Sequence, residues 1–108
     1  MKEETRRAIA YVAAIRINGT APSSLYSPDR RWRTTMSPGY DVDAQSHINA
    51  SGPCLYHHGT GSRIYLQVDG ACFSGFAQGE GHHFVGSIVG NSIEIYDYGE
   101  GRYFRYLI

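Results

Sequence analysis

Residues 96–104 read YDYGEGRYF, an aromatic residue followed by a glycine-containing turn and, eight positions later, another apolar residue. The same pattern occurs as FAQGEGHHF at residues 76–84 and as YHHGTGSRI at residues 56–64, so the period is 20 residues. Two fainter copies begin at Tyr26 and Tyr40. A fixed period of this kind indicates one supersecondary unit that is used several times.

The apolar positions around each turn alternate with a period of two. Side chains at every second position of a strand point to the same face. The alternation therefore predicts short strands and a core face whose members are Leu25, Met36, Ile48, Leu55, Ile64, Leu66, Val68, Phe73, Phe84, Ile88, Ile93, Ile95, Phe104 and Tyr106.

Turns separate the strands of every unit. Glycine and, less readily, aspartate tolerate a positive φ. We therefore expect a left-handed residue at the third position after each lead aromatic, which is Asp29, Asp43, Gly59, Gly79 or Gly99. The other ends of the strands carry dipeptides such as Asp69-Gly70, which are typical of two-residue hairpins. Five units then predict an antiparallel meander of roughly ten short strands.

The chain as a whole is predicted to form a single, mainly β domain over residues 1–108. Residues 2–16 carry an apolar stripe near the helical period, and Asn18-Gly19 is a plausible helix stop. Residues 21–108 hold the repeated hairpins. A meander of roughly ten strands is about 48 Å wide, which one helix cannot cover. The sheet must close into a barrel or fold into a two-layer roll, and we expect the helix to cover one end or a seam.

The unit IYDYGEGRY at residues 95–103 resembles a MORN repeat, which builds β-meanders from aromatic–glycine hairpins. MORN repeats have a longer period and a glycine pattern between hairpins that this sequence lacks. The whole chain is similar to small uncharacterised bacterial proteins built of tyrosine–glycine hairpins. The resemblance implies the architecture and a bacterial source, and it implies nothing about chemistry.

Composition limits the classes of partner. Ten basic and ten acidic residues give a net charge of zero, which disfavours nucleic acid and anionic membranes as partners. No apolar run approaches the ~20 residues that a membrane span needs. The first residues include Glu3 and Glu4, so they do not resemble a signal peptide. We expect a cytoplasmic protein, or a secreted one whose leader was removed.

Each lead aromatic has a predicted partner across its turn. Seven positions after Tyr26, Tyr40, Tyr56, Phe76 and Tyr96 come, in the same order, Arg33, His47, Arg63, His83 and Tyr103. Parity places both columns on the face opposite the core. They can be cross-strand pairs that stabilise each hairpin, or a stripe of rings that stacks on sugars or bases.

A ligand site is predicted where the glycine turns meet, because loops on a rigid scaffold usually carry function. Its expected residues are His47, His57, His58, His82, His83 and Asp97. No metal motif is present, so we expect no metal, no cofactor and no catalytic residue. Cys54 and Cys72 are expected to be free thiols, since one strand should separate them.

These observations favour a non-enzymatic binding or interaction module. A small molecule, a carbohydrate and a protein are the candidate partners. Two alternatives stay open: a barrel that carries a small apolar ligand, and a small enzyme that uses His and Asp at the turn end.

Overall fold

A computed structural model describes residues 1–52, 54–59 and 61–108. Within these residues the chain forms one helix, α1 (Glu3–Asn18), and ten strands. The strands are β1 (Ser24–Ser27), β2 (Trp32–Ser37), β3 (Tyr40–Asp41), β4 (Ser46–Ser51), β5 (Cys54–His57), β6 (Ser62–Asp69), β7 (Cys72–Ala77), β8 (His82–Val89), β9 (Ser92–Asp97) and β10 (Arg102–Leu107).

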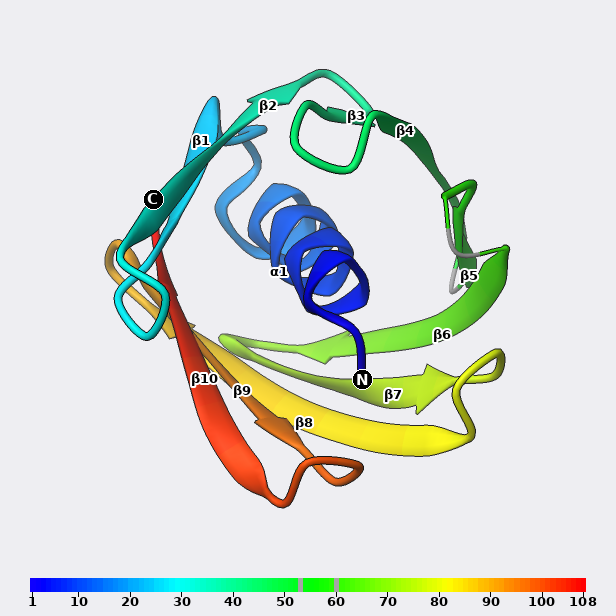
Figure 1. The fold of residues 1–108 in the computed structure, drawn as a ribbon. Helices are drawn as coiled ribbons and strands as arrows, with labels where there is room; N and C mark the ends of the chain where they lie inside the picture. The colour runs from blue at the N-terminus through cyan, green and yellow to red at the C-terminus, as the bar shows by residue number, and fades with distance from the viewer. Residues whose placement is uncertain (53, 60) are drawn as a thin grey trace.

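The strands make a closed antiparallel barrel in which each pairs with its neighbours in the chain (Figure 1). The barrel closes where β1 pairs with β10, with Tyr26 opposite Leu107. The predicted meander is therefore confirmed, and of the two predicted outcomes it is the barrel that forms. Closure gives each strand a neighbour on both sides.

Helix α1 lies inside the barrel, along its axis, and does not cover an end or a seam (Figure 1). Ten consecutive residues, Thr5 to Ala14, are buried, so the helix is enclosed on all sides. Small side chains at Ala8, Ala10, Ala13 and Ala14 let the backbone of the helix fit within the wall. The helix ends at Gly19, whose φ is 81° and whose N–H donates to the Ile15 carbonyl, as the sequence predicts.

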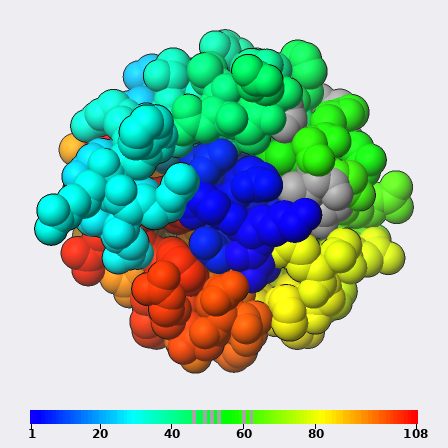
Figure 2. All heavy atoms as spheres, in the orientation of Figure 1, coloured from blue at the N-terminus to red at the C-terminus, as the bar shows by residue number. Residues whose placement is uncertain are grey.

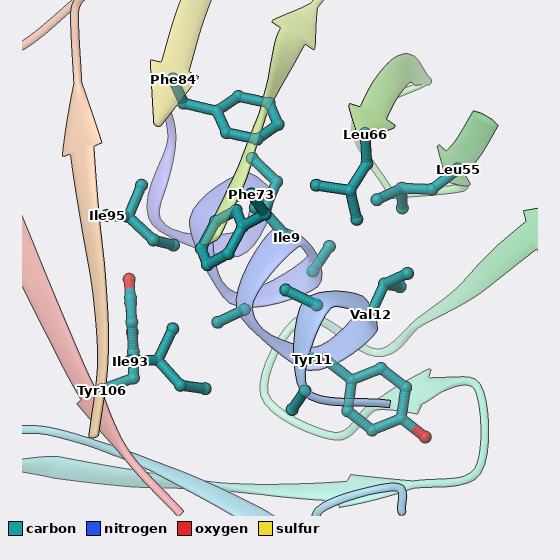
Figure 3. Close-up of a cluster of buried hydrophobic side chains, with 14 of the residues drawn as sticks. Ile9, Tyr11, Val12, Leu55, Leu66, Phe73, Phe84, Ile93, Ile95 and Tyr106 are labelled. Atoms are coloured by element: carbon teal, nitrogen blue, oxygen red, sulfur yellow. The ribbon is translucent and has the colours of Figure 1, made fainter. Parts of the chain in front are cut away.

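The core lies between α1 and the inner wall (Figure 3). Every predicted core residue is buried except Val68, which is 37% exposed near the end of β6. From the helix, Ile9 and Val12 project into the apolar cluster. Tyr11 also ties α1 to the wall, because its hydroxyl donates to the Ser37 carbonyl and accepts from the Gly39 N–H at 3.0 Å.

Two inward-facing glycines make room for two phenylalanine rings. Phe73 on β7 lies opposite Gly86 on β8, and Gly75 on β7 lies opposite Phe84 on β8. A Cβ on Gly75 would lie 2.7 Å from the Phe84 ring, and one on Gly86 would lie 2.4 Å from the Phe73 ring. Each ring therefore covers the glycine across from it, a pairing that suits a strongly curved sheet.

The five predicted cross-strand pairs all occur in the barrel. They are Tyr26–Arg33, Tyr40–His47, Tyr56–Arg63, Phe76–His83 and Tyr96–Tyr103. The predicted turn conformation, in contrast, is displaced by two residues. The left-handed residue is the fifth after each lead aromatic, not the third, and the five are Arg31, Gln45, Gly61, Gly81 and Gly101.

Gly99, the first glycine of its turn, is required for close packing. A Cβ on Gly99 would lie 2.6 Å from the His82 ring, so a glycine is needed there for close approach rather than for its φ.

Candidate functional site

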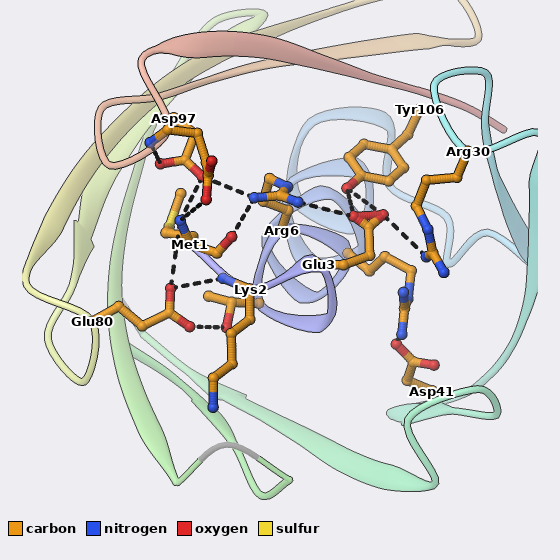
Figure 4. A network of polar contacts seen from close by, with 12 residues as sticks. Met1, Lys2, Glu3, Arg6, Arg30, Asp41, Glu80, Asp97 and Tyr106 are labelled. Carbon is orange, nitrogen blue, oxygen red and sulfur yellow. Dashed lines mark hydrogen bonds and ion pairs between the residues drawn. The ribbon is translucent and has the colours of Figure 1, made fainter.

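The glycine-turn end of the barrel holds a buried network of charged side chains around the start of α1 (Figure 4). Arg6 on the helix is 7% exposed and Asp97 on the wall is 0% exposed. The Arg6 Nη1 donates to Asp97 Oδ2 at 3.0 Å, and the α-amino group of Met1 donates to the same oxygen at 2.7 Å. The guanidinium carbon of Arg6 also lies 3.6 Å from the centre of the Phe104 ring. These contacts compensate a charge that would otherwise be costly to bury.

A second arginine–aspartate pair repeats the arrangement on another part of the wall. The Nε of Arg7 donates to Asp41 Oδ2 at 2.9 Å, and both residues are buried. Asp41 and Asp97 occupy the same place in two units, directly after the lead aromatic. All five residues at this place are buried, and we call them the inner ring: Ser27, Asp41, His57, Ala77 and Asp97.

Each inner-ring aspartate also closes its own turn. Asp97 Oδ1 accepts from the N–H groups of Gly99 and Glu100, at 2.8 and 3.2 Å. Asp41 Oδ1 accepts from the Ala44 N–H at 3.0 Å. Burial acts to raise the pKa of Asp97, but the hydrogen bonds from Met1, Glu100 and Arg6 outweigh it and hold the pKa below its usual value. Asp97 is therefore a carboxylate that locks a turn and anchors α1.

Glutamates complete the network. Glu3 accepts from the Tyr106 hydroxyl at 2.8 Å and pairs with Arg30 at 3.6 Å. Burial, reinforced by the charge of Glu3, raises the pKa of Tyr106, so this hydroxyl stays a donor. Glu80 accepts from the Thr5 hydroxyl at 2.7 Å and from the Lys2 N–H at 3.1 Å. Contacts from several turns thus hold the first turns of the helix.

The start of α1 fills the mouth of the barrel (Figure 2). Beside it remains a polar pocket of about 310 Å³, lined by Glu3, Glu4, Arg7, Arg30, Asp43, Ala44, His57 and Gly59. Burial lowers the pKa of His57, against the opposing charge of Asp41. The lining holds both signs of charge, and Arg7 and Arg30 are already paired within the chain. The residues of this pocket therefore serve mainly to hold α1 in the barrel, and we do not assign a ligand to it.

The outer wall carries several pairs of aromatic rings. On β3–β5 the rings of Tyr40 and His47 lie 4.9 Å apart, those of His47 and His58 6.4 Å, and those of Tyr56 and His58 4.8 Å. On β7 and β8 the rings of Phe76 and His83 lie 4.7 Å apart. Tyr40 and Phe76 thus pack against their cross-strand partners, His47 and His83.

A groove of about 750 Å³ runs over the outer wall of β6–β8 and reaches Tyr98 in the turn after β9, and we call it the aromatic groove. The register places Tyr65 beside Phe76, and Phe76 beside His83. A second row follows one step along the strands, with Gln67 beside Ser74 and Ser74 beside Val85. The groove is lined by Tyr65, Gln67, Ser74, Gly75, Phe76, Gly81, His82, His83, Phe84, Val85 and Tyr98.

The groove offers exposed aromatic rings and uncharged polar groups to a ligand. Tyr65 is 41% exposed and Tyr98 is 58% exposed. Among the described residues that line it, none is Asp, Glu, Lys or Arg. Aromatic faces interleaved with hydroxyl, amide and imidazole groups can stack on a flat ligand and hydrogen-bond its edges.

The aromatic groove continues toward the tight-turn end as a larger hollow of about 1010 Å³. The two share Gln67, Ser74 and Val85. The extension has carboxylates at Asp69 and Glu94, and Glu94 pairs with Arg105 at 3.4 Å.

The six residues of the predicted site lie in three places. His82 and His83 line the aromatic groove, and His57 and Asp97 face inward around α1. His47 and His58 lie with tyrosines on the outer wall of β4 and its neighbours.

Sequence reasoning missed two features of the site, the inward position of Asp41 and Asp97 and the groove itself. The alternation of the strands could have predicted the inward aspartates, because a residue next to an outward-facing aromatic must face inward. Arg6 and Arg7 could have pointed to the same aspartates, since buried arginines in an enclosed helix need carboxylate partners.

No protein-family model, curated protein or solved structure matches the chain. Over the described part of the chain, no helix combines the length and the apolar character that crossing a membrane requires. In the same residues, no three His, Cys, Asp or Glu side chains are grouped so that they could hold a metal ion. Cys54 and Cys72 are both free thiols, as the strand order predicts.

Proposed function

We propose that this protein is a non-enzymatic binding module that takes its ligand in the aromatic groove on the outer wall of β6–β8. The observation that carries the proposal is a cluster of rings around a groove of about 750 Å³: Tyr65 and Tyr98 are exposed, and Phe76 on β7 is half-buried. Exposed aromatic surface gathered in a concave site is what a ligand-binding surface requires.

Two other observations favour this function over its alternatives. A carrier would hold its apolar ligand inside the barrel, where α1 lies buried from Thr5 to Ala14. A His/Asp enzyme would need Asp97 within reach of a substrate, and Asp97 is 0% exposed and bonded to Arg6 and to its own turn. The rigid barrel then acts as a scaffold that presents a preformed surface.

The test is a nuclear magnetic resonance titration with three probes: cellohexaose, a proline-rich decapeptide and an oligothymidylate. Ser74→Trp fills the groove with a large ring, and Thr35→Trp on the exposed face of β2 is the matched control. We expect at least one probe to shift the amides of Tyr65, Phe76 and His83, and to lose binding only in Ser74→Trp. Shifts elsewhere, no shifts with any probe, or binding that survives Ser74→Trp would contradict the proposal.

A further inference from the structure

We infer that the ligand of the aromatic groove is an uncharged oligosaccharide; this inference rests on the proposed function of the groove. The first argument is the geometry of the rings. Tyr65, Phe76 and His83 lie side by side on three adjacent strands. Strands are about 4.8 Å apart, so the row is about 10 Å long and offers faces to more than one pyranose ring. The C–H face of a pyranose is slightly positive and meets the negative face of an aromatic ring favourably.

The second argument is the polar chemistry between the rings. Gln67, Ser74 and the imidazole of His83 each carry both a hydrogen-bond donor and an acceptor. Sugar hydroxyls also donate and accept, so every such group can find a partner in one orientation or another. A proline-rich peptide offers mainly carbonyl acceptors and would leave the acceptors of the groove unused.

The third argument is charge. None of the described lining residues is Asp, Glu, Lys or Arg, although 19% of the chain is charged. The extension of the groove adds two carboxylates, Asp69 and Glu94, and the guanidinium of Arg16. A polyanion such as a nucleic acid or an acidic glycan would therefore find no cationic lining in the groove, and in the extension it would meet more carboxylates than cations.

The fourth argument concerns the wall itself. An extended peptide commonly binds by adding a strand to an open sheet edge. The barrel is closed through β1 and β10, so the wall of the groove offers no such edge. Side-chain faces, not backbone groups, must carry recognition here, and that suits a ligand of rings and hydroxyls.

Calorimetric titration of the whole chain separates these ligand classes. The neutral set is cellohexaose, maltohexaose, xylohexaose and N-acetylchitohexaose, and the acidic set is hexagalacturonate and a heparin hexasaccharide. We expect at least one neutral glycan to bind, with an affinity that stays the same from low to high salt. The acidic set should not bind.

Variants locate the binding. Phe76→Ala should weaken it about tenfold, the effect of losing one stacking contact of about 1.4 kcal/mol. Tyr98→Ala, in an exposed turn, provides the same test with less risk to folding. Tyr26→Ala is the matched control, because Tyr26 holds the same repeat position on another part of the wall and should leave affinity unchanged.

The outcomes keep the two proposals apart. If no neutral glycan binds while the proline-rich decapeptide or the oligothymidylate shifts the groove amides, the saccharide inference fails and the binding function stands. If a glycan binds equally well to Phe76→Ala and Tyr98→Ala, the inference also fails. If no probe of any class perturbs the groove, both proposals fail.

Discussion

Replacing Asp97 with Asn tests whether charge pairs hold α1 inside the barrel. The substitution keeps the size of the side chain and an oxygen that can cap the turn at Gly99. It removes the negative charge that lies 3.0 Å from the Nη1 of Arg6, which is only 7% exposed. Breaking one partner of a buried ion pair costs about 3–5 kcal/mol. Because Glu3 still lies 3.4 Å from Arg6, we expect the lower end, about 3 kcal/mol.

Urea unfolding measures this cost directly, with the slope of the transition unchanged. The matched control is Asp69→Asn at the exposed end of β6, which should alter stability by less than about 0.5 kcal/mol. Adding Arg6→Leu to Asp97→Asn should recover part of the loss, since the buried guanidinium is gone and the α-amino group of Met1 keeps Glu80 and Glu100 within 4.0 Å. If Asp97→Asn is as mild as Asp69→Asn, the pair does not anchor the helix and the reasoning is refuted.

The Arg6–Asp97 ion pair also makes the stability of the fold depend on pH. The pKa of Asp97 is depressed in the folded protein, so its stabilising contribution is fully present above the ordinary aspartate pKa of about 4. That contribution is lost as the pH falls through the depressed value. The difference in stability between the native protein and Asp97→Asn should therefore shrink below about pH 4. A difference that stays constant down to pH 2 would assign the cost to something other than this charge.

Three further substitutions test the wall. Gly75→Ala should cost about 3 kcal/mol by urea unfolding, because its Cβ would strike the Tyr65 carbonyl and the Phe84 ring; a neutral result would contradict the close packing of β6 on β7. Phe84→Ala should cost about 3–5 kcal/mol and Phe76→Ala less than half of that, since Phe84 is 1% exposed and Phe76 lies on the outer wall; the reverse order would mean that the two faces are exchanged. Arg31→Gly should raise stability by about 0.5–1 kcal/mol in thermal melts, because Arg31 has a φ of 52° and glycine relieves that strain at some cost in chain entropy; a loss of stability would refute the strain.

Much of the barrel could be predicted from local pattern. The period of 20 residues and the alternation within it predicted the hairpins, their cross-strand pairs and the inward face, because these depend only on parity and turn spacing. The pair Phe76–His83 is one example. The prediction of the left-handed residue was wrong, since either glycine of a Gly-x-Gly can take a positive φ. In the turn at residues 99–101, the tight packing of Gly99 on His82 is a tertiary contact that local sequence does not show.

Features that depend on distant parts of the chain could not be predicted. Arg6 and Arg7 have the character of a solvent-facing side of a helix until the wall carboxylates are placed around them. The aromatic groove is likewise a product of register. Tyr65 and Tyr98 come from different hairpins, and only the order β6–β9 brings them to one surface.

Intermolecular nuclear Overhauser effects with a bound neutral hexasaccharide test the central claim most directly. The measurement records which ring protons lie within contact of the sugar C–H groups. We expect contacts to the rings of Tyr65, Phe76 and Tyr98, and none to Tyr26 on β1. Contacts to Tyr26 in place of the groove rings, or none at saturating glycan, would contradict the assignment of the ligand to this groove.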